Sequence, residues 1–346
     1  MQIEKWDGSS QDKEKILSLM KTVFGENEFS TKEYFEWIYE KNPQGKPIVV
    51  FALDEKKDSI IGIETIVPMN LWINKKSIKS ALSCNSAVHP DFRNKGIFGM
   101  LIDEIQKLAR EEKFSCIYGV PNRNSHHVFV KRGFSEIGKL KIYGKPFKIS
   151  KYFGNHSILK PLDYLIKKGK DQIKLESFKE DFDSRYDDLF NKKIMINGII
   201  TTKNKDFLNW RYKQHPTREY ETFSFHEKNE LLSYIILRKT TYEKKQVVVI
   251  VDFVIHPKII EYEGITKFVF SVLNNYQDDC VAVITTINPE FREFNVLKNI
   301  GFMSIPKIFK PEPFYFITSL LEPFEGQEKF QVFNNWFLCF GDYDVF

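Results

Sequence analysis

The chain has 346 residues, more than one typical domain holds, so we expect two domains. Hydrophobic residues make up 42% of the sequence and aromatic residues 15%, a composition that favours packed cores and excludes an intrinsically disordered chain. The net charge is +5, but basic and acidic residues are interleaved along the whole length, so nucleic-acid binding is not indicated.

The cysteines and the apolar segments indicate the compartment. The cysteines lie far apart and lack the Cys-x-x-Cys spacing of a zinc site, which favours free thiols in a reducing environment and no bound metal: Cys84, Cys116, Cys280 and Cys339. No segment approaches the ~18 apolar residues of a membrane span, and the N-terminal residues do not resemble a signal peptide. We therefore expect a soluble, cytoplasmic protein of unknown oligomeric state.

The first ninety residues predict helices followed by antiparallel strands. Apolar residues recur at helical spacing over 12–23, and Thr31 is placed to cap a second, aromatic helix that ends at Asn42-Pro43. Runs rich in β-branched and other apolar residues, separated by charged turns, predict strands at 3–6, 47–53, 60–67, 71–74 and 80–88.

The turn after the last of these strands indicates an anion site. Pro90 ends the strand, Arg93 and Lys95 supply positive charge, and a helix starts after Gly96. Backbone N–H groups at a helix N-terminus have no partner within the helix, and the helix dipole favours an anion there. Since no Gly-Lys pair is followed by Ser or Thr, this is not the magnesium-dependent nucleotide loop, and we predict a pyrophosphate ligand.

Two motifs resemble the GNAT acetyltransferases. Arg93-x-x-Gly96, with Val88-x-Pro90 ahead of it, is similar to their acetyl-CoA loop, although Phe98 stands where a second small residue is usual. Gly133-Phe134 resembles the end of the family's helix beside the coenzyme thiol. The resemblance implies a mixed, mostly antiparallel sheet flanked by helices, which is an α/β (α+β) fold.

The same resemblance implies acetyl-CoA as co-substrate. Freed backbone N–H groups near Ala87 and Val88 would bind the pantetheine and the thioester carbonyl. The implied coenzyme-binding residues are Ala87, Val88, Arg93, Asn94, Lys95, Gly96, Ile97, Phe98, Gly99, Asn122, Ser125 and Phe129.

The second half repeats the first at an offset of about 170 residues. Trp210 corresponds to Trp37, His256-Pro257 to His89-Pro90, and Gly301-Phe302 to Gly133-Phe134. These ordered matches predict two tandem GNAT-like domains. The copied loop has no arginine and carries Glu261 and Glu263, which would repel a pyrophosphate, so we expect only the first domain to bind the coenzyme.

We predict domain boundaries from these patterns. Residues 1–148 form the coenzyme-binding domain, 149–170 a connector, and 171–346 the degenerate copy with a C-terminal extension. The connector has an amphipathic stretch that packs across the two domains or, less favoured, lies on a membrane surface. The aromatic and β-branched residues 330–340 predict a further strand.

Acetyl transfer requires an amine freed of its proton, a polarised thioester and a proton for the leaving thiolate. Glu64 on a central strand and His126 or His127 beside the thiol helix are the candidate bases, and each has an ordinary structural alternative. Asn85 would orient the acceptor or make a structural hydrogen bond. The family's tyrosine proton donor falls at Phe129, so His126, which shares its helix face approximately, is the preferred replacement.

The favoured function is that of an acetyl-CoA-dependent N-acetyltransferase acting on a primary amine of a small molecule, with amino sugars among the candidates. One alternative is an acyl-CoA-binding sensor or scaffold without turnover. Another is an acyltransferase that modifies an amine of a protein or peptide lying between the domains.

Overall fold

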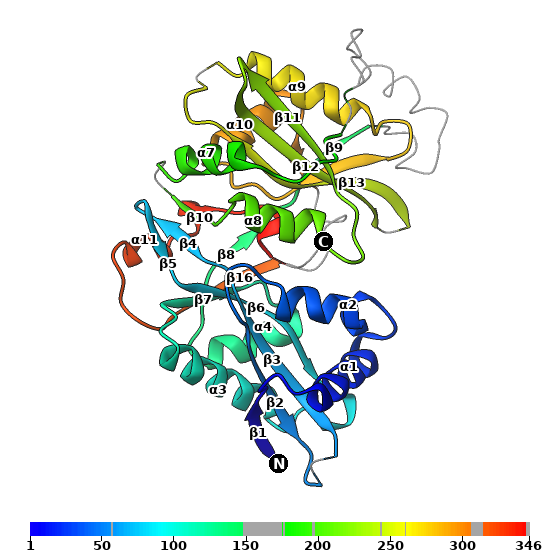
Figure 1. Ribbon diagram of the computed structural model, residues 1–346, viewed down its shortest axis with the longest axis vertical. Coiled ribbons are helices and arrows are strands. Elements are labelled where there is room, and N and C mark those ends of the chain that lie inside the picture. The colour runs from blue at the N-terminus through cyan, green and yellow to red at the C-terminus, as the bar shows by residue number, and fades with distance from the viewer. Residues whose placement is uncertain are drawn as a thin grey trace.

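The computed structural model describes residues 1–56, 58–147, 175, 177–195, 198–242, 244–259, 261–305 and 314–343. In this part of the chain, a seven-stranded sheet and a six-stranded sheet form the two halves, and a small four-stranded sheet lies between them (Figure 1). The architecture is the predicted one of two tandem α/β units, each a mixed sheet flanked by helices. The predicted connector at 149–170 lies outside the described residues.

The first half follows the predicted order of elements. A strand and four helical segments come first: β1 (Gln2–Lys5), α1 (Ser10–Phe24), η1 (Glu28–Ser30), α2 (Lys32–Phe35) and η2 (Glu36–Glu40). Five strands follow: β2 (Ile48–Leu53), β3 (Ile60–Pro68), β4 (Leu71–Ile73), β5 (Lys76–Ile78) and β6 (Ser80–Val88). The remaining elements are η3 (Pro90–Phe92), α3 (Ile97–Glu111), β7 (Cys116–Gly119), α4 (Arg123–Lys131), β8 (Ser135–Leu140) and β9 (Tyr143–Pro146).

The second half has a similar order. It begins with α7 (Ser184–Lys193), β10 (Ile199–Thr201), α8 (Lys205–Leu208), η5 (Asn209–Lys213), β11 (Glu221–Glu227), β12 (Glu230–Tyr242) and β13 (Lys245–Ile255). It continues with α9 (Glu263–Asn274), β14 (Ala282–Thr285), α10 (Arg292–Asn299), β15 (Met303–Ser304) and β16 (Phe314–Leu320). The C-terminal elements are α11 (Gln327–Phe330), η7 (Phe333–Asn335), β17 (Trp336–Phe337) and η8 (Phe340–Asp342).

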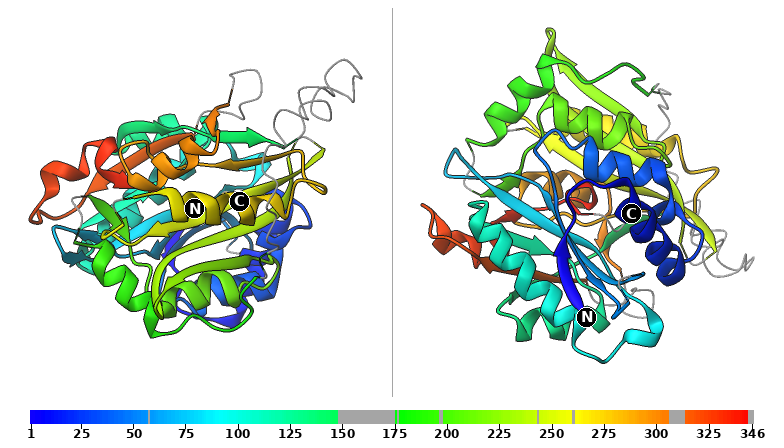
Figure 2. Two further views of the ribbon diagram at one scale, coloured as in Figure 1. Left: turned by 90° about the horizontal axis from the view of Figure 1, so that it is seen from above. Right: turned by 60° about the horizontal axis from the view of Figure 1, so that its bottom comes forward.

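Helices cover both faces of the first sheet. The Ser9 side chain accepts a hydrogen bond from the Asp12 N–H and caps α1, which ends at Gly25 with a φ of 82°. The apolar side of α1 packs into the larger core, whereas α3 packs with the other face of β2 and β3 in a second core. In the right-hand view of Figure 2, the dark blue α1 and the cyan α3 lie on opposite sides of the strands.

The two large sheets exchange a strand. The first sheet has the order β1-β2-β3-β6-β7-β16-β8, so β16 of the second half lies between two strands of the first. The second sheet has the order β11-β12-β13-β14-β9-β15, so β9 of the first half lies between two strands of the second. The boundary at residue 148 stays a prediction. Each of the two large sheets contains strands from both sides of this residue.

Equivalent tryptophans of the repeat meet between the halves. The rings of Trp37 and Trp210 stack with centroids 4.8 Å apart and planes 13° apart. Trp37 Nε1 donates to the Trp210 carbonyl at 2.8 Å, and Trp210 Nε1 donates to the Trp37 carbonyl at 2.9 Å. This reciprocal contact shows that the aromatic segments matched in the sequence are also equivalent in the structure.

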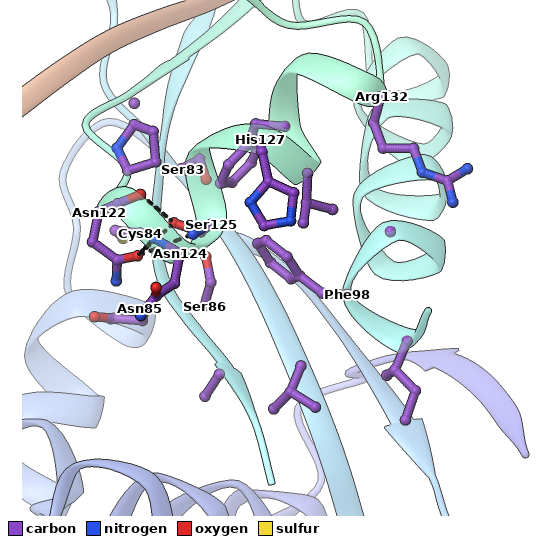
Figure 3. Close-up of a pocket in the computed structure, with 18 of the residues that line it drawn as sticks. Ser83, Cys84, Asn85, Ser86, Phe98, Asn122, Asn124, Ser125, His127 and Arg132 are labelled. Carbon is purple, nitrogen blue, oxygen red and sulfur yellow. Dashed lines mark hydrogen bonds between the residues drawn. The ribbon is translucent and has the colours of Figure 1, made fainter. Parts of the chain in front are cut away.

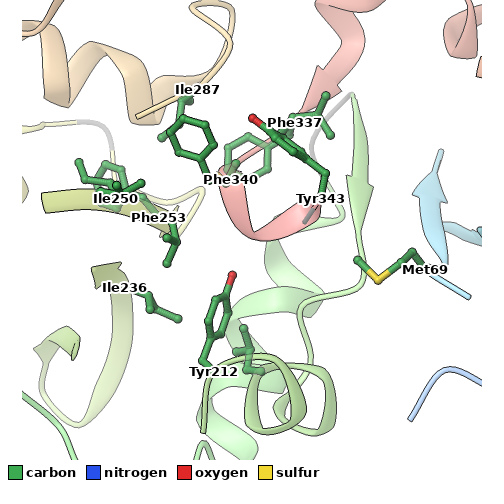
Figure 4. Close-up of a cluster of buried hydrophobic side chains, with 14 of the residues drawn as sticks. Met69, Tyr212, Ile236, Ile250, Phe253, Ile287, Phe337, Phe340 and Tyr343 are labelled. Atoms are coloured by element: carbon green, nitrogen blue, oxygen red, sulfur yellow. The ribbon is translucent and has the colours of Figure 1, made fainter. Parts of the chain in front are cut away.

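A buried ionic cluster fixes the C-terminal segment. Lys203 Nζ lies 2.9 Å from Asp252 Oδ2 and 2.6 Å from Asp342 Oδ1, and all three side chains are at most 1% exposed. The Tyr212 hydroxyl donates to Asp252 at 3.1 Å, in an apolar surrounding that includes Tyr343 (Figure 4). The predicted C-terminal strand is present as β17, which pairs with β10 in the small sheet.

Candidate active site

The candidate site begins where two parallel strands separate. β6 pairs with β7 only from Ser80 to Ser83, opposite Cys116 to Gly119, although β6 continues to Val88. Asn85 has a φ of 57°, and the pairing of β6 with β3 shifts register at this point. The resulting bulge and divergence open a cavity of 1480 Å³ between the strands and the helices that follow them (Figure 3).

The predicted phosphate loop forms one end of this cavity. Asn94 and Gly96 adopt left-handed conformations, with φ values of 62° and 78°, which turn the chain into α3 at Ile97. The first helical backbone bond runs from the Met100 N–H to the Gly96 carbonyl, so the N–H groups before Met100 are not used within the helix. Arg93 is exposed beside them, with Nε 3.3 Å from the Val88 carbonyl. This is the geometry of an anion site at a helix N-terminus.

Nearly all of the predicted coenzyme residues line the cavity. The exception is Lys95, which is exposed and holds its Nζ 4.7 Å from the centre of the Phe92 ring. The lining residues among those predicted are Ala87, Val88, Arg93, Asn94, Gly96, Ile97, Phe98, Gly99, Asn122, Ser125 and Phe129.

The departure at Phe98 is accommodated by aromatic packing. The Phe98 ring contacts the Phe129 ring edge to face, with centroids 5.3 Å apart, and stays partly exposed to the cavity. At the next position, the Arg132 guanidinium lies against Gly99, 2.7 Å from where a Cβ would stand. The loop therefore places an aromatic ring at Phe98 and the end of a flexible arginine side chain against Gly99.

Glu64 is a buried carboxyl beside the bulge. The Ser83 hydroxyl donates to Glu64 Oε1 at 2.7 Å, and Glu64 Oε2 makes no hydrogen bond of good geometry within the described chain. Burial raises the pKa of Glu64 to about 7, and the hydroxyls of Ser86 and Ser83 partly oppose this rise. Both serines line the cavity, so the Ser83 hydroxyl lies between the cavity and the Glu64 carboxyl. A carboxyl with a pKa near 7 is suited to act as a general base.

Asn85 lines the cavity but also has a structural partner. Its Nδ2 donates to the Tyr39 hydroxyl at 3.0 Å, which ties the bulge to η2. Burial raises the pKa of Tyr39, so this hydroxyl stays protonated at physiological pH. The structural alternative weighed for Asn85 is thus realised, and a role in orienting the acceptor stays a prediction.

His126 is not part of the cavity lining. His127 lies in the cavity wall (Figure 3). The His126 ring stacks on Tyr315 with centroids 3.9 Å apart, and its Nε2 lies 2.9 Å from Glu136 Oε2. The helical spacing from Phe129 suggested the opposite arrangement. The difference arises because the exchanged strand β16 brings Tyr315 against α4 and takes up His126.

Several lining residues lie far from the motifs in the sequence. Val23, Phe24 and Phe29 come from α1 and the segment after it, Ile317 from the exchanged strand, and Tyr343 from the C-terminal segment. No local motif marks these residues, because α1 reaches the cavity by packing on β3 and β6, and Ile317 and Tyr343 come from the other half of the chain. The only signal in the sequence was the aromatic content of the segments.

In the second half, a side chain accepts the backbone N–H that corresponds to that of Val88. Ile255 corresponds to Val88 in the repeat, and its N–H donates to Glu293 Oε1 at 3.0 Å. Glu293 is fully buried and forms an ion pair with Lys193, which is also buried. A smaller cavity of 400 Å³ lies beside Lys193 and the first residues of α10. The N–H that would meet a coenzyme is therefore already used.

Comparison with known proteins identifies the class. Residues 7–137 match the sequence profile described as the acetyltransferase (GNAT) domain. The first half of the chain therefore matches the GNAT superfamily, and the second half repeats its order of elements. Among curated proteins, no sequence matches the chain.

Solved structures share the fold across both halves. A GCN5-related N-acetyltransferase from Anabaena variabilis is 12% identical with a TM-score of 0.63, over 93% of this chain and 73% of that chain. N-myristoyltransferase of Saccharomyces cerevisiae with bound myristoyl-CoA is 11% identical with a TM-score of 0.58, over 92% of this chain and 82% of that one. A probable N-acyltransferase from Enterococcus faecalis is 10% identical with a TM-score of 0.61, over 93% of this chain and 73% of that chain.

These comparisons support acyl transfer from an acyl-CoA as the general activity of the fold. Among the described residues, no helix is both long and apolar enough to cross a membrane. The same residues contain no cluster of His, Cys, Asp and Glu suited to a metal ion.

Proposed function

We propose that the protein is an acetyl-CoA-dependent N-acetyltransferase that acts on a primary amine of a small molecule. The observation that carries this proposal is the single cavity joining the N-terminus of α3 to the separated strands β6 and β7. A pyrophosphate at α3 and a thioester at the strands are the two ends of one coenzyme, and the cavity accommodates both.

The loop residues bind the coenzyme. The N–H groups at the start of α3 and the Arg93 guanidinium hold the pyrophosphate. The backbone N–H groups near Ala87 and Val88, which have no β7 partner, face the thioester carbonyl and stabilise the oxyanion as it forms.

Glu64 removes the proton from the amine through Ser83. The Ser83 hydroxyl accepts a proton from the acceptor nitrogen while it passes its own proton to Glu64. The nitrogen attacks the thioester carbon, the C–N bond forms, and the C–S bond breaks. The thiolate then takes a proton from His127 or from solvent, since a thiol has a reference pKa of about 8.5. The direct transfer needs no covalent enzyme intermediate.

The first test is binding and turnover with acetyl-CoA itself. Calorimetry is expected to show binding of one acetyl-CoA per chain, and mass spectrometry of a panel of primary amines is expected to show an acetylated product. Failure to bind acetyl-CoA would refute the proposal. Tight binding without a product across the panel would instead support the acyl-CoA sensor.

A further inference from the structure

The cavity has an apolar wall on the face of the sheet opposite the phosphate loop. Val23, Phe24 and Phe29 line it, and Phe24 is 40% exposed. Val23 and Phe24 end α1, and Phe29 lies in η1 after it. α1 packs on one face of the first sheet, whereas the phosphate loop precedes α3 on the other face. With the coenzyme bound on the α3 side, the wall faces the part of the acyl group or of the amine that lies beyond the thioester.

The charge of the lining argues against a polycationic acceptor. Among the described residues that line the cavity, there are four cations and no carboxylate: Arg93, Arg123, Lys131 and Arg132. A ligand with several ammonium groups would meet only repulsion from these charges. An apolar group, by contrast, would cover side chains that are otherwise exposed to water.

An ion pair with the second half holds the wall in place. Arg218 Nε lies 3.1 Å from Glu28 Oε1 and 3.0 Å from Glu28 Oε2, and Arg218 Nη2 also bonds Oε1. The Thr217 hydroxyl donates to Glu28 Oε2 at 2.7 Å. Since the Arg218 side chain is only 3% exposed and Glu28 directly precedes Phe29, this bidentate pair fixes the segment that carries the ring.

Aromatic contacts connect the wall to the junction of the halves. Phe24 and Phe29 have ring centroids 5.8 Å apart, and Phe29 contacts Tyr34 at 5.3 Å. Tyr34 contacts Trp37 at 5.5 Å, and Trp37 stacks on Trp210. The wall is therefore part of a continuous row of aromatic contacts that includes Trp210 of the second half.

We propose that the wall of Val23, Phe24 and Phe29 binds an apolar group of a substrate beyond the thioester, and that the Glu28–Arg218 pair positions the wall. The group is the body of the amine or the chain of a longer acyl-CoA; both sources have the same chemistry. This inference rests on the proposed function and adds a substrate class to it.

The source is tested with two series of probes. Acetyl-, hexanoyl- and decanoyl-CoA are compared by calorimetry, and octylamine is compared with glucosamine and spermidine as acceptors for acetyl-CoA. Each buried methylene is expected to strengthen binding roughly fourfold. A gain along the acyl series assigns the wall to the acyl chain, and a preference for octylamine assigns it to the acceptor. A chain that binds acetyl-CoA but shows neither preference overturns the inference while leaving the proposed function intact.

The wall itself is tested by Phe24→Asp, at a side chain that is already partly exposed. The preferred apolar probe is expected to lose at least tenfold in binding or in kcat/KM, while acetyl-CoA affinity stays unchanged. An unchanged preference in the variant would overturn the assignment of the wall.

The pair is tested by Glu28→Gln and by the double variant Glu28→Leu with Arg218→Met, which leaves no unpaired buried charge. We expect KM for the apolar probe to rise severalfold and kcat to change little. Lys239→Met removes an exposed ion pair with Asp279 in the same half and serves as the matched control. If the double variant folds and keeps the KM of the wild type, Glu28 and Arg218 are structural only.

Discussion

The Ser83 hydroxyl donates a 2.7 Å hydrogen bond to Glu64, and the serine lines the cavity while the carboxylate is fully buried behind it. In the proposed reaction, this arrangement keeps a titratable group out of water and still within one proton transfer of the amine. Burial is the main cause of the raised pKa of Glu64.

The rate of acetylation is expected to rise with pH and to level off above an apparent pKa near 7, because Glu64 accepts a proton only when it is ionised. Glu64→Gln should lower kcat by roughly a hundredfold or more and remove this pH dependence. Acetyl-CoA affinity, measured by calorimetry, is the control and should not change. A Glu64→Gln enzyme with the wild-type profile would exclude Glu64 as the base.

The same group predicts a pH dependence of stability. Because the pKa of Glu64 is raised from 4.5 in the unfolded chain to about 7 in the folded one, its contribution is fully present below pH 4.5 and is lost as the pH rises through 7. The loss approaches roughly 3 kcal/mol above pH 8. Urea unfolding of Glu64→Gln and wild type should show the variant gaining in relative stability between pH 5 and pH 8, and parallel curves would contradict the assignment.

Arg93→Ala is expected to weaken acetyl-CoA binding roughly tenfold to a hundredfold through loss of a charge-assisted contact. Gly96→Val should also weaken it, because a β-branched residue does not tolerate the φ of 78° at the start of α3. Lys95→Ala is the matched control, since Lys95 lies outside the cavity lining, and its effect should be smaller. If calorimetry shows the same acetyl-CoA affinity for all three variants and the wild type, the assignment of this turn as the phosphate loop is wrong.

His127→Ala is expected to lower the acetylation rate more than His126→Ala, because His127 lines the cavity and His126 is held by Tyr315 and Glu136. This reverses the order that helical spacing alone predicts. Steady-state rates on an identified acceptor decide between them. Equal and near-wild-type turnover in both variants would identify solvent as the proton source.

Titration with acetyl-CoA is expected to give one site per chain. In the second half, Glu293 already accepts the N–H of Ile255, and Glu263 stands in the first turn of α9 where the first half has no acidic residue. Arg93→Ala should therefore weaken the only binding event. Two sites of similar affinity per chain would show that the Glu293 carboxylate can be displaced.

The sequence was informative where chemistry is local. The turn around Gly96 and the start of α3 depend on residues within a few positions of one another, so their pattern predicted this part of the structure. The tandem repeat was also visible, because Trp37 and Trp210 occupy equivalent positions and meet each other.

The features that the sequence did not predict depend on contacts between residues far apart in the chain. The spacing of His126 and Phe129 describes a helix face but not what packs against it, and Tyr315 arrives from the other half of the chain. The buried position of Glu64, on which its raised pKa depends, follows from the whole sheet and its helices. Phe24 and Tyr343 reach the cavity by tertiary packing, which a single sequence does not encode in any short pattern.

The exchange of β9 and β16 also has a consequence for synthesis of the protein. As the chain leaves the ribosome, β7 and β8 are made well before Phe314–Leu320, the strand that will lie between them. Until then, both present open edges that favour pairing with other chains, so the newly made N-terminal half is the form most exposed to aggregation and most in need of a chaperone. A gene cut near residue 148 should yield an insoluble N-terminal product, and co-expression of the two fragments should recover solubility by supplying the missing strand.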